Sequence, residues 1–205
     1  MMIKDFGSRV ESVWENLRTV TKKMLVGALQ AKSGNIANTP TQKFSYDTQS
    51  DWELSRLLTA LDEQAKDFEV VENPEKSGEI KQLADTCVSV LQAQTESAEV
   101  FIQLAERALA ARDYAQIDRL ADALAERFSV GEMCEIARQT TNPAIRAIAM
   151  ETLALMPIEE IMPSFDDPVY EDIARTALEI KAVEYESADA RQVLDHLGYD
   201  EFDGD

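Results

Sequence analysis

The feature that most constrains the fold is an internal repeat with a period of 25 residues. The first copy is EMCEIARQTTNPAIRAIAMETLALM, residues 132–156, and the second is PIEEIMPSFDDPVYEDIARTALEIK, residues 157–181. A repeat of this length is a supersecondary unit that cannot bury its own apolar face, so neighbouring copies have to stack. Six positions are identical: Glu135/Glu160, Ile136/Ile161, Pro143/Pro168, Ile148/Ile173, Ala149/Ala174 and Leu153/Leu178.

Both copies place the same start signal before a helical stripe. Asn142-Pro143 and Asp167-Pro168 set a capping side chain before a proline at the first helical position. Each unit is therefore predicted to be a shorter helix, a turn and a well-capped longer helix. The stripes that follow have helical spacing: Ile145, Ile148, Ala149, Thr152 and Leu153 in one copy, and Tyr170, Ile173, Ala174, Ala177 and Leu178 in the other.

On these residues the chain resembles the HEAT-like family of helical repeats. The short bacterial form of that family opens its second helix with Asp/Asn-Pro-x-Val/Ile-Arg-x-x-Ala. Residues 142–149, NPAIRAIA, fit this pattern, whereas residues 167–174, DPVYEDIA, carry Glu171 in place of the arginine. The resemblance implies an all-α fold, an α-solenoid-like right-handed stack of antiparallel helix pairs, and use as a binding scaffold.

The rest of the chain is also expected to be helical. Seven glycines and six prolines in 205 residues are too few for the turns of a β-sandwich or barrel. Apolar spacing predicts one long amphipathic helix over 8–32, and a C-terminal capping helix over 187–198. We expect two parts: residues 1–50, the amphipathic helix with a polar linker, and an acidic helical-repeat domain, residues 51–205, with the HEAT-like units at 132–181.

Capping boxes mark two further helix starts. Ser50 with Glu53 and Ser129 with Glu132 have the Ser-x-x-Glu spacing, in which the serine accepts a hydrogen bond from an amide of the first turn. We therefore expect helices to begin at these two serines.

Charge is distributed unevenly along the chain, whose net charge is −19. Residues 1–50 hold seven Lys/Arg against four Asp/Glu, and residues 51–205 hold thirteen against thirty-five. An acidic body repels a phosphate backbone, which argues against nucleic acid as partner. It is compatible with a basic protein partner, or with an acidic surface that serves only solubility. The sequence has no apolar run of about 18 residues and no secretory signal. Cys87 and Cys134 are expected to be reduced thiols in the core. We therefore expect a cytoplasmic protein.

The sequence offers no recognisable reaction centre. It lacks the glycine-rich phosphate loops, the HExxH metal motif and the GxSxG nucleophile motif. The acidic pairs Glu159-Glu160 and Asp166-Asp167 stand at expected helix starts, where carboxylates cap. His196 is the sole histidine, which leaves little to build a relay or a metal site from. We therefore expect no catalytic residues, no cofactor and no metal.

These observations favour a non-enzymatic interaction module. We expect an adaptor or scaffold that binds a protein partner, basic in character, or further copies of the chain, through solenoid faces. Two alternatives stay open: a HEAT-like enzyme or carrier of a tetrapyrrole-type ligand, and attachment to a membrane surface through residues 8–32. The candidate partner-binding residues lie on helix faces away from the apolar stripes, and are Trp14, Arg146, Glu151, Glu171, Arg175 and Glu179.

Overall fold

The structure is a computed structural model that describes residues 6–32 and 46–200. All regular secondary structure in these ranges is helical, which confirms the all-α prediction. None of the described helices is long and apolar enough to cross a membrane. The chain forms two compact units, residues 1–95 (unit 1) and residues 96–205 (unit 2).

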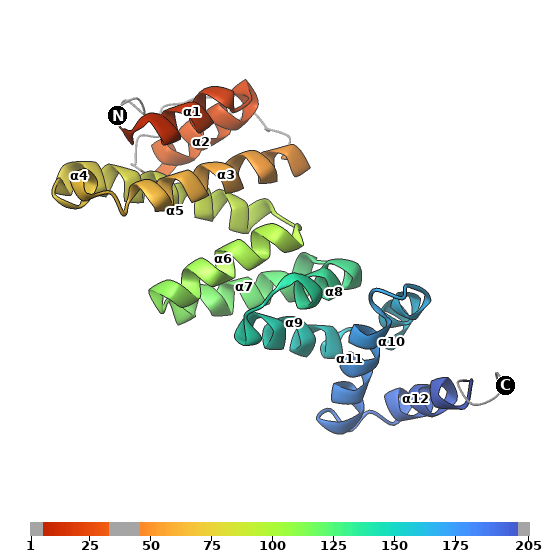
Figure 1. The fold of residues 1–205 in the computed structure, drawn as a ribbon. Helices are drawn as coiled ribbons and strands as arrows, with labels where there is room; N and C mark the ends of the chain where they lie inside the picture. Colours follow the sequence, from red (N-terminus) through yellow and green to blue (C-terminus); the bar gives the residue numbers. More distant parts are fainter. Residues whose placement is uncertain (1–5, 33–45, 201–205) are drawn as a thin grey trace. The chain divides into compact units, whose positions relative to one another are not determined.

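The described part of unit 1, residues 6–32 and 46–95, contains five α-helices. Figure 1 shows how they are arranged. Helix α3 packs against α1, α2 and α5, and α5 also contacts α2 and α4. The core between them is rich in fully buried leucines, such as Leu54, Leu57 and Leu61 of α3. The helices are α1 (Ser8–Asn16), α2 (Thr19–Lys32), α3 (Thr48–Gln64), α4 (Phe68–Val71) and α5 (Pro74–Gln94).

The prediction of a single helix over 8–32 is wrong, because the chain leaves helical geometry at Leu17. Leu17 has extended backbone angles, φ −66° and ψ 144°. Glu53 of α3 is only 2% exposed and causes the restart: its carboxylate accepts the Arg18 backbone N–H at 2.9 Å and the Thr21 hydroxyl. A side chain from another helix thus satisfies donors at the start of α2 that have no partner within α2 itself.

An ion-paired cluster holds this break against the start of α3. The Arg18 guanidinium donates to both Asp47 oxygens, at 2.9 and 2.6 Å, and to Glu53 at 3.2 Å. Hydrogen bonds from Arg18 and Ser50 hold the pKa of Asp47 well below its usual range. Asp47 is also the N-cap of α3, so the helix begins earlier than the Ser50–Glu53 capping box predicts.

The compact units do not follow the expected division at residue 50. Helices α1 and α2 pack on α3 and α5 and belong to the same unit, because their apolar stripe is buried there: Val10, Leu17 and Leu25 are at most 6% exposed. The polar linker expected over 33–50 falls mostly outside the described residues, which resume at Tyr46.

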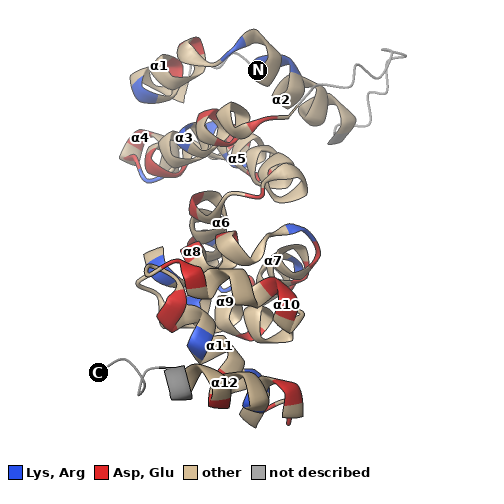
Figure 2. Cartoon of the chain, turned by 90° about the vertical axis from the view of Figure 1, so that its right-hand side faces the viewer, with Lys and Arg blue, Asp and Glu red and all other residues tan. Residues whose placement is uncertain are grey.

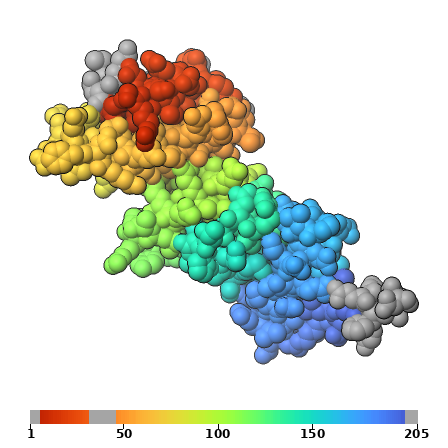
Figure 3. All heavy atoms as spheres, viewed as in Figure 1, coloured from red at the N-terminus to blue at the C-terminus, as the bar shows by residue number. Residues whose placement is uncertain are grey.

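Unit 2 is built from helix pairs (Figure 1). Helix α6 packs on α7 and α8 packs on α9, while α6 also contacts α8, and α9 contacts both α7 and α11. The space-filling view shows these helices as one continuous surface (Figure 3). The elements are α6 (Ala98–Ala111), α7 (Tyr114–Arg127), α8 (Val130–Gln139), α9 (Pro143–Leu155), α10 (Ile158–Ile161), the 3₁₀ helix η2 (Met162–Asp166), α11 (Glu171–Val183) and α12 (Ala188–Asp200).

The two repeat copies differ in their helix starts. The first behaves as predicted: Asn142 accepts the Ala144 N–H at 3.0 Å, and Pro143 is the first residue of α9. In the second, α10 and η2 replace the shorter helix; Asp167 accepts the equivalent Val169 N–H at 2.9 Å, but residues 168–170 form a turn rather than the first turn of a helix. Helix α11 therefore begins at Glu171, and its stripe remains buried at Ala174, Ala177 and Leu178.

The C-terminal helix covers the last apolar surface of unit 2. The helix expected over 187–198 is present as α12, and Ser187 accepts the Ala190 N–H at 3.2 Å before it. Ala190 is fully buried against Leu178 and Ala182 of α11, and Val193 and Leu194 pack on the same cluster. These contacts close the end of α11 as expected of a capping helix.

Candidate docking surfaces

Helices α7, α9 and α11 lie side by side, and their outward residues define a surface that we call the acidic face. Its carboxylates are all exposed: Asp118 and Asp122 of α7, Glu151 of α9, and Asp172 and Glu179 of α11. Asp118 and Asp122 are one helical turn apart, and Asp172 and Glu179 are two turns apart, so each pair shares a side of its helix. Figure 2 shows acidic residues (red) spread over the helices of unit 2.

The acidic face has an apolar end. Leu155 follows Glu151 by one turn and is 57% exposed, and Val183 follows Glu179 by one turn and is 73% exposed. The Tyr185 hydroxyl donates to Glu151 at 2.9 Å, which brings the C-terminal end of α11 beside α9. This hydrogen bond raises the pKa of Tyr185. On α9 and α11 an exposed aliphatic side chain therefore follows the last carboxylate of the acidic face.

Three cations close the C-terminal ends of preceding helices. Arg146 of α9 donates to Ala137 O at 3.1 Å and Thr140 O at 3.0 Å, at the end of α8. Lys181 of α11 donates to Ala154 O at 2.9 Å and Met156 O at 3.0 Å, at the end of α9. Arg191 of α12 donates to Ala182 O at 2.7 Å, in the last turn of α11. The carbonyls at these ends lack partners within their own helix, and a cation also complements the helix dipole.

The structure thus places the candidate partner-binding residues in different surroundings. Glu151 and Glu179 lie on the acidic face, whereas the Arg146 guanidinium is engaged with α8. Arg175 pairs with Glu171 one turn earlier, at 3.2 Å.

Trp14 belongs to unit 1 and is separate from that group. The Lys22 ammonium lies 6.0 Å from the centre of its ring. Lys22 also donates to the Glu15 carbonyl at 3.0 Å, so it bridges α1 and α2. Lys22 and Trp14 therefore form a contact across the helix break at Leu17.

Sequence reasoning missed Glu135, which joins α8 to the segment before α11. Its carboxylate accepts from Arg138 at 2.6 and 2.7 Å, from Gln139 at 2.6 Å and from the Tyr170 hydroxyl at 3.1 Å. These bonds, led by that of Arg138, lower the pKa of Glu135 to about 2. The partners Arg138 and Gln139 have helical spacing from Glu135, but the contact with Tyr170 depends on the tertiary fold.

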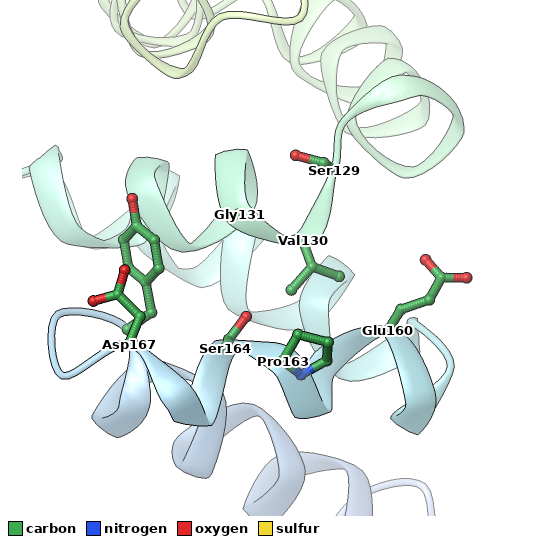
Figure 4. A pocket seen from close by; sticks show the side chains of 8 residues that line it. Ser129, Val130, Gly131, Glu160, Pro163, Ser164 and Asp167 are labelled. Carbon is green, nitrogen blue, oxygen red and sulfur yellow. The ribbon is translucent and has the colours of Figure 1, made fainter.

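A depression of about 450 Å³ opens beside the start of α8 and is broadly exposed to solvent (Figure 4). Val130 and Pro163 form an apolar middle, and the carboxylates of Glu160 and Asp167 stand at its two ends. Ser164 is 8% exposed and hydrogen-bonds to the Cys134 thiol beneath. The remaining lining residues are Ser129, Gly131 and Tyr170. Ser129 caps α8 as predicted, accepting the Glu132 N–H at 3.2 Å.

The described side chains assemble no group of three or more His, Cys, Asp and Glu that could hold a metal ion. Cys87 and Cys134 are buried and do not form a disulfide, and burial raises the pKa of the Cys134 thiol. His196 is exposed on α12, with Nδ1 2.7 Å from the Gln192 carbonyl. A buried thiol with a raised pKa is a poor nucleophile, because the thiolate is the reactive form.

Comparisons with known proteins find no matching family, no matching curated protein and no matching solved structure.

Proposed function

We propose that the chain is a non-enzymatic helical-repeat interaction module, an adaptor or scaffold whose unit 2 binds a basic protein segment along the acidic face. The proposal rests above all on one observation: five exposed carboxylates on three adjacent helices end in the exposed side chains of Leu155 and Val183. A segment that carries lysines or arginines and a few apolar residues complements both features.

A solenoid-like stack is the arrangement we propose for unit 2. Lys181 of α11 and Tyr185, two residues after α11 ends, both reach the C-terminal half of α9, which supports a parallel course for these equivalent helices. Repeated closure of a helix end by a cation from a later helix also supports a serial, pair-by-pair build. Serial stacks expose long surfaces on which an extended or helical segment can lie.

Burial of Val10 and Leu25 inside unit 1 leaves less of the apolar stripe over residues 8–32 available to a membrane surface, whereas Val20 of the same stripe is 42% exposed. We therefore favour the acidic face over membrane attachment as the proposed docking surface. We place the protein in the cytoplasm, where two buried thiols stay reduced.

The experiment is a titration of the full chain with a fluorescently labelled helical peptide of leucine and lysine, followed by anisotropy. The test variant is Glu151→Lys with Glu179→Lys, and the control is Glu69→Lys with Glu72→Lys in unit 1, which changes the net charge equally. We expect the test variant to bind at least about tenfold more weakly and the control to bind like the parent, because a charge in direct contact with the peptide has a larger effect than an equal change in net charge.

A scrambled peptide of the same composition serves as a second control, because an acidic protein attracts any cation. The parent should prefer the amphipathic peptide, whose leucines can cover Leu155 and Val183. Equal weakening by the two charge-reversed variants, or equal binding of the two peptides, would remove the acidic face from the proposal.

A further inference from the structure

We infer that the depression beside the start of α8 is an anchor site for an arginine side chain of a bound protein. It is separate from the acidic face, because none of its lining residues belongs to that surface. Its volume of about 450 Å³ is large enough for a side chain, and its broad opening suits a group delivered from a partner's surface rather than an enclosed small molecule.

The electrostatics of the depression favour a cation. Glu160 and Asp167 contribute two full negative charges, and neither is in an ion pair within the described residues. The N-terminus of α8 opposes them, but a helix end carries only about half a positive charge. The nearby cation Arg138 is already held by Glu135 at 2.6 Å. The net field in the depression therefore attracts a positive group.

The shape and chemistry select a guanidinium rather than an ammonium. The methylene stem of an arginine can cover Val130 and Pro163, which lie between the two carboxylates (Figure 4). Asp167 uses one oxygen to accept the Val169 N–H at 2.9 Å, and this bond fixes the direction of the carboxylate. A planar guanidinium offers several donors to such a fixed carboxylate, and Tyr170 adds an aromatic group to the wall.

Two variants of the lining test this site. Asp167→Asn keeps an oxygen for the Val169 N–H but removes the charge. Gly131→Leu fills the depression: a Cβ at Gly131 meets only the Ser129 hydroxyl, at 3.8 Å, which is ordinary contact. Asp166→Asn is the matched control, because Asp166 is exposed, adjacent in sequence and absent from the lining.

The experiment is an NMR titration of the isotope-labelled full chain with three monocations: N-acetyl-arginine amide, N-acetyl-lysine amide and methylguanidinium. We expect the arginine amide to give saturable amide shifts at Val130, Gly131 and Ser164, with a millimolar dissociation constant suited to one side chain. Asp167→Asn should weaken binding about tenfold and Gly131→Leu should abolish it, while the Asp166→Asn control binds like the parent.

The other two probes identify the source and the chemistry of the cation. The lysine amide should bind several-fold more weakly, because an ammonium cannot make two parallel hydrogen bonds. Methylguanidinium should bind more weakly than the arginine amide, because it has no methylene stem to cover Val130 and Pro163. Equal shifts with lysine amide, equal or tighter binding of methylguanidinium, shifts dispersed over the acidic face, or an equal loss in Asp166→Asn would each overturn the inference.

Discussion

Replacing Arg146 by methionine should destabilise unit 2. The substitution keeps most of the aliphatic stem but removes the donors to Ala137 O and Thr140 O, 3.1 and 3.0 Å away. A hydrogen bond from a charged group contributes about 1.5–3 kcal/mol when it is well shielded from water. Because Arg146 is partly exposed and water can replace it, we expect a total loss of about 1–2 kcal/mol.

Urea unfolding measures this loss, and tryptophan fluorescence distinguishes unfolding of unit 1 from unfolding of unit 2. Both tryptophans, Trp14 and Trp52, belong to unit 1, so their fluorescence follows that unit, whereas far-UV circular dichroism follows helices of both. With a denaturant slope of about 2 kcal/mol per molar, the dichroism midpoint of Arg146→Met should fall by about 0.5–1 M. The fluorescence midpoint should change much less.

Two further variants test whether the lost hydrogen bonds at the end of α8 cause the loss of stability. Arg119→Met removes the same charge from an exposed arginine whose hydrogen bonds within the described residues go to Gln116 on its own helix, and its effect should stay within about 0.5 kcal/mol. Arg146→Lys should recover part of the loss, since Lys181 closes α9 in the same manner. If Arg146→Met and Arg119→Met unfold at the same urea concentration, the capping argument is refuted.

Two other predictions concern unit 1, and tryptophan fluorescence measures both. Hydrogen bonds from Arg18 and Ser50 lower the pKa of Asp47, and a carboxyl with a lowered folded-state pKa stabilises above about pH 4 and loses this contribution as the pH falls. We therefore expect unit 1 to lose stability below about pH 4, and Asp47→Asn to reduce that dependence; an unchanged acid slope would contradict the role of the cluster. Gly78→Ala, within α5 and with no atom within 4 Å of the added Cβ, should raise the free energy of unfolding by about 0.5–1 kcal/mol. Gly7→Ala should lower it, because φ is +109° and the new methyl group would collide with a side chain of α3; the reverse order of the two glycine variants would contradict this explanation.

The sequence predicts helix starts well where the signal is local. Asn142 and Ser129 cap their helices as expected, because a cap and its first-turn amides are at most three residues apart. The break at Leu17 has no such local signal: the apolar stripe continues through it, and Glu53, 35 residues after Arg18, provides the bonds that restart α2. Stripe periodicity therefore identifies core residues such as Val10, Leu17 and Leu25, although Val20 is 42% exposed, and it does not show where one helix becomes two.

The candidate surfaces show the same limit. Helical spacing correctly places Glu151 and Glu179 away from the buried stripes. It cannot show that Arg146 reaches the end of α8, since this depends on how two helices pack. The depression is beyond sequence reasoning altogether, because it brings Gly131 together with Pro163 and Asp167 through the unexpected α10 and η2.

The order of the three closing cations along the chain gives unit 2 a direction. Arg146, Lys181 and Arg191 each come later in the sequence than the carbonyls to which they donate. During synthesis the ribosome releases each helix before the residue that secures its last turn, so every nascent helix has a frayed end until its successor emerges. A message truncated between two helices would therefore produce a protein with one loose terminus open to proteases, even though all its preceding helices are intact.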